Sequence, residues 1–231
     1  MTRLHFIGGE KGGVGKSVVA RILAQYFIDK QIPFRGFDTD KSHGSLIRFY
    51  SDFAAPAIID SYDGLDRIVE SATEEPERRI IVDLAAQTHQ FLAKWMDESQ
   101  LLEIAAELEL SSVYWHVMDS GRDSVELLAK LLDQFGNRLP LVVVLNQVRG
   151  DDFSHLEASG TLARAKELGA QVITLPRLHD STMQKIDTHN TSFWAAGNRG
   201  GKDGSPLGLL ERQRVRSWLS KAYEQIDRVT A

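Results

Sequence analysis

The sequence contains no cysteine among its 231 residues. Disulfides, cysteine-ligated zinc sites and protein-ligated iron–sulfur clusters are therefore excluded. The seven histidines include no His-x-x-x-His pair, so a zinc site on a helix is not favoured either. No apolar run approaches the roughly 20 residues that a membrane-spanning helix needs. The first apolar run is also too short for a signal peptide, and we expect a cytoplasmic protein.

An excess of positive charge is also missing. The chain has 27 lysines and arginines against 32 aspartates and glutamates, a formal net charge of -5. This balance argues against a wholly basic nucleic-acid binder and leaves a local basic patch open. The apolar content of 42% and charged content of 26% are ordinary for a globular protein. The length suits one α/β domain over residues 1–231, and we find no internal repeat.

Short apolar runs alternate with helical patterns along the chain. The expected strands are 4–7, 34–37, 79–83, 113–118, 141–145 and 171–175. The expected helices are 17–30, 44–53, 62–72, 89–108 (interrupted near 98–99), 124–135, 156–168 and 209–229. This alternation predicts an α/β fold with a mostly parallel central sheet, flanking helices and a long C-terminal helix. Residues 195–208 contain five glycines and are predicted to form a mobile loop.

The first strand leads into a glycine-rich turn, Phe6-Ile-Gly-Gly-Glu-Lys-Gly-Gly-Val-Gly-Lys-Ser17. A strand, a glycine-rich loop and a helix in this order form the setting of a phosphate-binding loop. The glycines allow successive backbone N–H groups to point at phosphate oxygens, and the new helix adds its positive end. Lys16 would neutralise the outer phosphates, while the Ser17 hydroxyl would bind Mg²⁺. The pattern predicts a single P-loop nucleoside triphosphatase (NTPase) domain.

Carboxylates follow two further predicted strands at the edge where ligands bind in such sheets. Asp83 ends a buried strand, and its carboxylate fits a magnesium ligand or a cap of the following helix. Asp38 and Asp40 end the second strand. One of this pair would face the γ-phosphate while the other supports Mg²⁺ or a loop, and turn formation is the alternative for each.

Lys11 is a second lysine at the start of the phosphate loop, where nucleotide binding within one subunit does not require it. The run Lys11-Gly-Gly-Val-Gly-Lys-Ser17 resembles the deviant Walker A box of the ParA/MinD family of P-loop ATPases. Asp38-Thr-Asp40 resembles the family's second acidic box, and Ile80-Ile-Val-Asp83 its Walker B strand. The resemblance implies that Lys11 reaches across an ATP-sandwich dimer to the partner's phosphates, and that Asp38 is associated with the hydrolytic water.

Two departures separate the chain from the usual partition proteins. Lys41-Ser-His-Gly44 stands where those proteins carry Pro-Gln-Gly, and Asp83-Leu-Ala-Ala86 replaces Asp-x-Pro-Pro. The short ParA-like proteins of conjugative and mobilisable plasmids, the TraL and StbB type, are more similar in pattern. The stretch 37–40 and the terminal run 211–216 carry that second resemblance.

Asn146 ends the fifth long strand and resembles the family's adenine-contacting asparagine, with a loop-capping role as the alternative. Pro176 resembles the segment that lines the base. The expected catalytic residues are Lys11, Lys16, Asp38 and Asp40, and the expected metal residues are Ser17, Asp38 and Asp83. The expected nucleotide-binding residues are Gly12, Gly13, Val14, Gly15, Lys16, Ser17, Val18, Asn146 and Pro176.

The segment 199–228 carries a local positive charge, and its helix has one apolar face. The plain interpretation is a helix docked on the sheet with solvated arginines. The functional one is a non-specific DNA surface that includes Arg212, Arg214, Arg216 and Lys221. A membrane is not expected as a partner, since acidic residues interrupt the basic face.

The resemblance therefore implies a Mg-ATP-binding switch that forms a homodimer on ATP and hydrolyses it slowly to ADP and phosphate. A small adaptor or DNA-binding protein would stimulate hydrolysis, in plasmid or DNA partition, stability or conjugative transfer. The alternatives are a membrane-positioning ATPase of the MinD type and a metabolic ligase or kinase of the same fold.

Overall fold

The computed structural model describes residues 2–40, 44–75, 77–105, 107–200 and 206–230. Within them, one sheet contains the strands β1 (Thr2–Gly8), β2 (Phe34–Asp38), β3 (Ala54–Pro56), β4 (Arg79–Asp83), β5 (Leu110–Met118), β6 (Leu141–Asn146) and β7 (Gln171–Leu175). The strand order is β3-β2-β4-β1-β5-β6-β7, and every neighbouring pair is parallel. The predicted fold class is confirmed.

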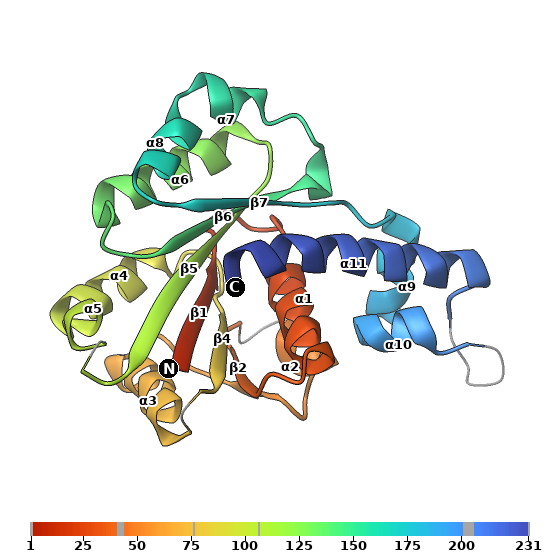
Figure 1. The fold of residues 1–231 in the computed structure, drawn as a ribbon, viewed down its shortest axis with the longest axis horizontal. Coiled ribbons are helices and arrows are strands. Elements are labelled where there is room, and N and C mark those ends of the chain that lie inside the picture. Colours follow the sequence, from red (N-terminus) through yellow and green to blue (C-terminus); the bar gives the residue numbers. More distant parts are fainter. Residues whose placement is uncertain (1, 41–43, 76, 106, 201–205, 231) are drawn as a thin grey trace.

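Helices cover both faces of this sheet (Figure 1). One face is covered by α1 (Lys16–Asp29), α2 (Ser45–Phe49), α9 (Asp180–Thr188), α10 (Phe193–Asn198) and the long C-terminal helix α11 (Leu209–Thr230). The other face is covered by α3 (Tyr62–Glu74), α4 (His89–Glu98), α5 (Leu101–Ile104), α6 (Arg122–Phe135), α7 (Ser154–Ala158) and α8 (Thr161–Glu167). A short 3₁₀ turn, η1 (Gln147–Arg149), follows β6.

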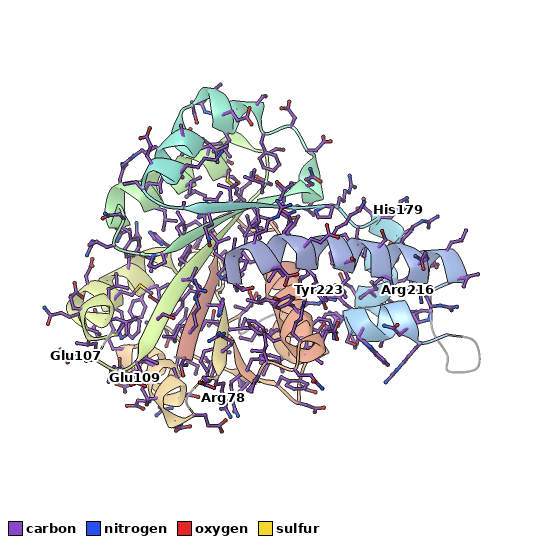
Figure 2. The ribbon with its side chains drawn as sticks, in the orientation of Figure 1. Arg78, Glu107, Glu109, His179, Arg216 and Tyr223 are labelled. Carbon is purple, nitrogen blue, oxygen red and sulfur yellow. The ribbon has the colours of Figure 1, made fainter. Side chains whose placement is uncertain are left out.

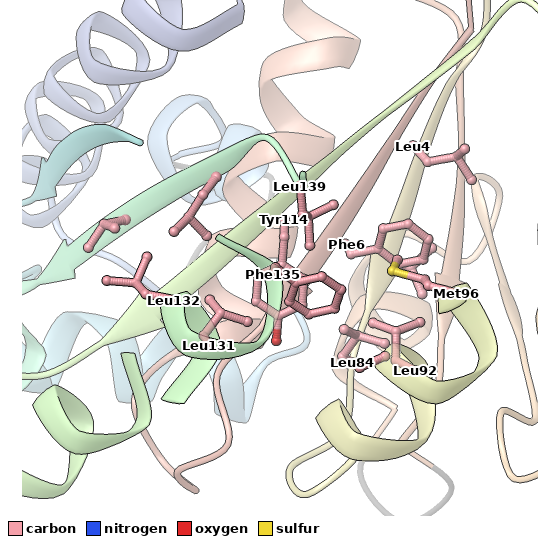
Figure 3. Packing of buried hydrophobic residues seen from close by; sticks show 14 of the residues in the cluster. Leu4, Phe6, Leu84, Leu92, Met96, Tyr114, Leu131, Leu132, Phe135 and Leu139 are labelled. Atoms are coloured by element: carbon pink, nitrogen blue, oxygen red, sulfur yellow. The ribbon is translucent and has the colours of Figure 1, made fainter. Parts of the chain in front are cut away.

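The hydrophobic core has two layers, one on each side of the sheet. Leu4 and Phe6 of β1 belong to the layer under α3, α4 and α6, while Ile7 belongs to the layer under α1 and α11. Figure 3 shows Phe6 and Tyr114 beside Met96 of α4 and Phe135 of α6. A parallel strand that is buried on both faces needs apolar residues at nearly every position. This requirement explains why the central strands were recognisable as continuous apolar runs.

Two predicted helices differ from the structure. The helix expected over 44–53 ends at Phe49, and residues 54–56 form the edge strand β3, whose Ala54 pairs with Gly36 of β2. The helix expected over 156–168 is two helices, because Gly160 has a φ of 74° and turns the chain between them. In both places the helix ends earlier than the apolar pattern predicts, at the strand β3 in the first case and at Gly160 in the second.

The prediction of a loop over 195–208 was wrong at its beginning. Residues 195–198 belong to α10, which Ser192 caps by accepting a hydrogen bond from the Ala195 amide. Phe193 and Ala196 are buried in the same core layer as α11. Tertiary packing therefore overrides the weak helix propensity of this segment. Residues 201–205 of the expected loop, and residues 41–43 directly after the second acidic box, lie outside the described residues.

Helix α9 was not predicted, since no helix was expected between the strand that ends before Pro176 and residue 209. It contributes Thr182 and Ile186 to the buried face. None of the helices among the described residues is both long and apolar enough to cross a bilayer.

Candidate functional site

The phosphate loop connects the end of β1 at Gly8 with the start of α1 at Lys16. Gly13 and Gly15 have φ angles of 72° and 94°, which favour glycine. A Cβ on Gly15 would also lie 2.3 Å from Asn146 Nδ2. The described loop therefore has the curled backbone that the sequence predicts, with Gly12 and Gly13 exposed and Val14 buried.

Lys16 lies inside this loop. Its residue is only 8% exposed, and Nζ donates a hydrogen bond of 3.2 Å to the Lys11 carbonyl. Burial lowers the pKa of Lys16, and the nearby charges of Asp83, Glu10 and Asp40 oppose that shift. The ammonium is thus held at the mouth of the loop among carboxylates, where an incoming phosphate would find a positive charge.

Two carboxylates stand side by side beyond the ends of β2 and β4. The parallel register pairs Asp38 with Asp83. Thr39 links the two strand ends, since its hydroxyl donates to the Asp83 carbonyl at 3.0 Å and accepts from the Ala85 amide at 2.8 Å. The predicted acidic residues therefore meet at the same edge of the sheet, next to Lys16.

The Asp38 carboxylate has a structural partner in the structure. Oδ2 accepts hydrogen bonds from the amides of Leu46 at 2.7 Å and Ile47 at 3.3 Å, in the first turn of α2. Oδ1 accepts from the Asp40 amide at 3.1 Å. Burial raises the pKa of Asp38, and these three amides work against the rise. Asp38 therefore ties the start of α2 to the nucleotide edge of the sheet.

Asp83 is deeply buried, with only 3% of the residue exposed. Neither carboxylate oxygen has a hydrogen-bond partner among the described residues. Burial, followed by the charge of Asp38, raises the pKa of Asp83 to about 7, while Ser17 and Lys16 oppose the rise. Buried charges are normally paired or bound to a metal.

The side chains of Asp83 and Ser17 fit a magnesium ion whose other ligands are phosphate oxygens and waters. The described residues contain no cluster of three or more His, Cys, Asp or Glu side chains that would hold a metal alone. Mg²⁺ usually takes only one or two protein ligands together with phosphate oxygens and waters. Asp83 and the Ser17 hydroxyl provide such a pair.

The Asp83→Asn substitution should remove a pH dependence of stability in the nucleotide-free protein. Because the folded pKa lies above the unfolded value, the folded state binds the extra proton and stability falls as the pH rises from about 4 to about 7. The loss amounts to at most about 4 kcal/mol. Thermal unfolding from pH 4 to pH 8 would measure it. A variant at the exposed Asp63, Asp63→Asn, should keep the wild-type slope, and an unchanged slope in Asp83→Asn would contradict the assignment.

Lys11 points away from the loop. Its ammonium lies 3.3 Å from Oδ1 of Asp119, which directly follows β5, and 3.9 Å from Oδ2 of Asp123, in the first turn of α6. The two lysines of the loop therefore have different environments, Lys16 inside the loop and Lys11 outside it. A lysine held outside its own loop is available for a second function.

Asn146 is the last residue of β6, and Pro176 directly follows β7. Asn146 Nδ2 donates a buried hydrogen bond of 2.8 Å to the Val14 carbonyl of the phosphate loop. The Pro176 carbonyl accepts a hydrogen bond of 2.7 Å from the indole of Trp218 in α11. Asn146 thus has the loop-capping role that the sequence left open, and its contact with adenine stays a prediction.

Comparison with known proteins decides the family. Residues 5–187 match the CobQ/CobB/MinD/ParA nucleotide binding domain, CbiA. The chain belongs to this family. The match includes the phosphate loop, both acidic strand ends and Asn146. Nucleotide binding and the fold follow from this membership, and the predicted relationship to ParA and MinD is confirmed.

Individual relatives in sequence cover nearly the whole chain. Protein MobD of Acidithiobacillus ferrooxidans is 25% identical over 230 residues, 98% of this chain and 97% of that protein. Protein TraL of Escherichia coli is 25% identical over 244 residues, 98% of each. Among solved structures, the MinC:MinD cell division complex of Aquifex aeolicus gives a TM-score of 0.56 at 11% identity, over 95% of this chain and 96% of that one. The predicted similarity to TraL-type proteins is confirmed.

The cations of α11 do not form one surface in this family member. Arg212 and Arg216 donate to the carbonyls of Leu207 and Gly197, on the side of α10. Arg214 and Lys221 line a cavity of about 550 Å³ on the other side, together with residues 176–180. Figure 2 shows His179 of this cavity and Arg216 on different sides of α11. The four cations of the predicted DNA surface therefore lie on two sides of α11, and their contact with DNA stays a prediction. A helix turns by about 100° per residue, and residues two apart point in nearly opposite directions.

Four further residues that lie next to the predicted site were not singled out from the sequence. Glu10 accepts a hydrogen bond of 2.8 Å from the His89 amide and so fixes the start of α4 against the loop. Thr39 joins the two acidic strand ends, and Asp119 and Arg149 surround Lys11. Thr39 lies inside the second acidic box and Glu10 directly precedes Lys11 of the phosphate loop, so the polarity of both side chains was a usable signal. Asp119 and Arg149 lie more than 100 residues from Lys11, and no local pattern connects them.

Proposed function

We propose that the chain is a Mg-ATP-dependent molecular switch that dimerises on ATP and separates after hydrolysis to ADP and phosphate. The observation that carries the proposal is the different placement of the two loop lysines. Lys16 lies in the loop, where it serves the nucleotide of its own subunit, whereas Lys11 lies 3.3 Å from Asp119 outside it. Membership of the MinD/ParA family supports the same conclusion.

The residues of the site divide the chemistry among them. Lys16 and the loop amides would neutralise the phosphates, and Ser17 with Asp83 would hold Mg²⁺. Mg²⁺ would supply charge neutralisation on the β- and γ-phosphates. Asp38 or Asp40 would position the water that attacks the γ-phosphorus, and the bond to the β-phosphate oxygen would break. Asn146 and Pro176 would contact the base.

The wild-type protein tests this proposal directly. Sedimentation velocity should give a monomer without nucleotide and with ADP, and a dimer with Mg²⁺ and a non-hydrolysable ATP analogue. Phosphate release should be slow, because a switch must persist until a partner acts on it. A protein that stays monomeric with the analogue, at concentrations that saturate binding, would contradict the proposal.

The process that we propose for this switch is plasmid or DNA transfer, stability or partition in the cytoplasm. The full-length similarity to MobD and TraL supports this direction. A small adaptor or DNA-binding protein would then stimulate hydrolysis. Direct contact with DNA would come from the cavity side of α11, where Arg214 and Lys221 lie beside Arg177 and His179.

The double substitution Arg214→Ala/Lys221→Ala should weaken DNA binding and lower the slope of log K against log salt concentration by about 2. Each cation contributes about one phosphate contact, so the loss should be similar for unrelated sequences. Fluorescence anisotropy with a labelled duplex at several salt concentrations would measure both quantities. Arg212→Ala/Arg216→Ala removes the same charge from the other side of the helix. It should change both the DNA affinity and its salt dependence less than Arg214→Ala/Lys221→Ala does. Equal losses in the two double variants would refute the assignment to the cavity side.

A further inference from the structure

Asp119 has a buried carboxylate that lies near two cations, Lys11 of the phosphate loop and Arg149 of the turn after β6. It follows β5, and its side chain is 1% exposed. Oδ1 accepts hydrogen bonds from the Ser124 hydroxyl at 2.6 Å, the Gly121 amide at 3.1 Å and Lys11 Nζ at 3.3 Å. Burial alone would raise the pKa of Asp119, but these three donors outweigh it and hold the pKa below its ordinary value. Asp119 is therefore charged when Lys11 is bound.

Arg149 approaches the other oxygen of the same carboxylate. It ends the turn η1 after β6, and its NH1 lies 3.3 Å from Asp119 Oδ2. Its NH2 lies against the phosphate loop, 2.8 Å from the position that a Cβ on Gly13 would take. Half of the side chain is exposed, at 52%. Lys11 and Arg149 thus reach Asp119 from the β1 and β6 sides.

The two carboxylate oxygens of Asp119 would keep different partners if Lys11 moved away. Oδ1 keeps the Ser124 and Gly121 donors. Oδ2 has no hydrogen-bond partner among the described residues, so Arg149 is the cation that faces it. A buried carboxylate without a counter-ion is strongly unfavourable. Departure of Lys11 is therefore tolerable only while a second cation stays.

We propose that Arg149 is the counter-ion that remains on Asp119 when Lys11 leaves it, and that Arg149 thereby permits ATP-dependent dimerisation. The role rests on the proposed function, in which Lys11 moves to the phosphates of the partner subunit. Arg149 is a positioning residue in this scheme, since it acts through Asp119 and Lys11. Without Arg149, Lys11 stays bound to Asp119 in its own subunit.

The test compares the wild type with Arg149→Ala, Asp119→Asn and the double variant Asp119→Asn/Arg149→Ala. Arg149→Ala should bind a fluorescent ATP analogue within about threefold of the wild type and unfold at the same temperature without nucleotide. Its dimer dissociation constant should rise about 10- to 100-fold, as expected when a buried carboxylate loses its remaining counter-ion. The double variant should dimerise within about threefold of Asp119→Asn, because a neutral amide needs no counter-ion.

Sedimentation equilibrium with Mg²⁺ and the non-hydrolysable analogue gives the dimer constants, and Arg122→Ala is the matched control. Arg122 is 79% exposed on α6 and pairs with Glu126. Two results would overturn the role of Arg149: unchanged dimerisation in Arg149→Ala, or an equal loss that Asp119→Asn does not rescue. The second result would mean that Arg149 contacts the nucleotide or the partner directly. A wild type that fails to dimerise on ATP would instead overturn the proposed function, so the two failures are distinguishable.

Discussion

Lys11→Ala should abolish ATP-dependent dimerisation while ATP binding stays within about threefold of the wild type. Lys11 is outside its own loop, with Nζ on Asp119, and Lys16 remains to neutralise the phosphates of the same subunit. In the dimer, the loss of a charged contact with a phosphate should raise the dissociation constant about 100-fold or more. Sedimentation velocity with the non-hydrolysable analogue would measure the dimer, and a fluorescent analogue would measure binding.

The fold should tolerate this change. Asp119 keeps Arg149, the Ser124 hydroxyl and the Gly121 amide when Lys11 is removed. Lys94→Ala is the control, because Lys94 is 67% exposed on α4 and pairs only weakly with Glu98 at 3.6 Å. If Lys11→Ala still dimerises like the wild type, Lys11 does not act across the subunits.

Lys16→Ala should lose nucleotide binding, by about 100-fold or more. The ammonium is buried at the mouth of the loop, where it would pair with phosphate in a site shielded from water, and truncating such a pair costs about 2–5 kcal/mol. Thermal unfolding with increasing ATP measures this loss, because a ligand stabilises the folded state by RT ln(1 + [L]/Kd). The wild type should gain stability at ATP concentrations that leave Lys16→Ala unchanged.

Without nucleotide, Lys16→Ala should unfold close to the wild-type temperature. Burial already disfavours the charged form of Lys16, so its removal relieves a desolvation penalty while it takes a positive charge away from Asp83. Lys11→Ala serves as the control from the same loop, since it removes one lysine and leaves the other. If Lys16→Ala binds ATP as tightly as Lys11→Ala does, Lys16 is not the phosphate-binding lysine of this loop.

The phosphate site could be predicted because its parts are local in sequence. A buried parallel strand, a glycine-rich turn and a helix follow one another within residues 2–29. The ends of neighbouring parallel strands meet at one edge, so Asp38 and Asp83 could be placed together without knowledge of side-chain contacts. The strong apolar patterns of the strands were therefore sufficient to predict both the sheet and the central residues of the site.

Prediction failed where packing or a single backbone angle decides the local structure. Helix α10 forms because Phe193 and Ala196 are buried with α11, although Gly197 lies within it. Gly160 divides one helical pattern into α7 and α8 through a positive φ. The helical period alone places Arg212 and Arg214 on nearly opposite sides of α11. Only the tertiary structure shows what each of these two sides contacts.

For Lys11, the sequence by itself determined that a second lysine stands in the loop and that the loop belongs to a nucleotide site. Only the tertiary structure decided that Lys11 lies on Asp119, 108 residues away, and that Arg149 shares this carboxylate. The reason is physical. The loop owes its shape to glycines and strand order close by in the chain. An ion pair between the segments that follow β1 and β5 forms only once the sheet has brought those two strands together.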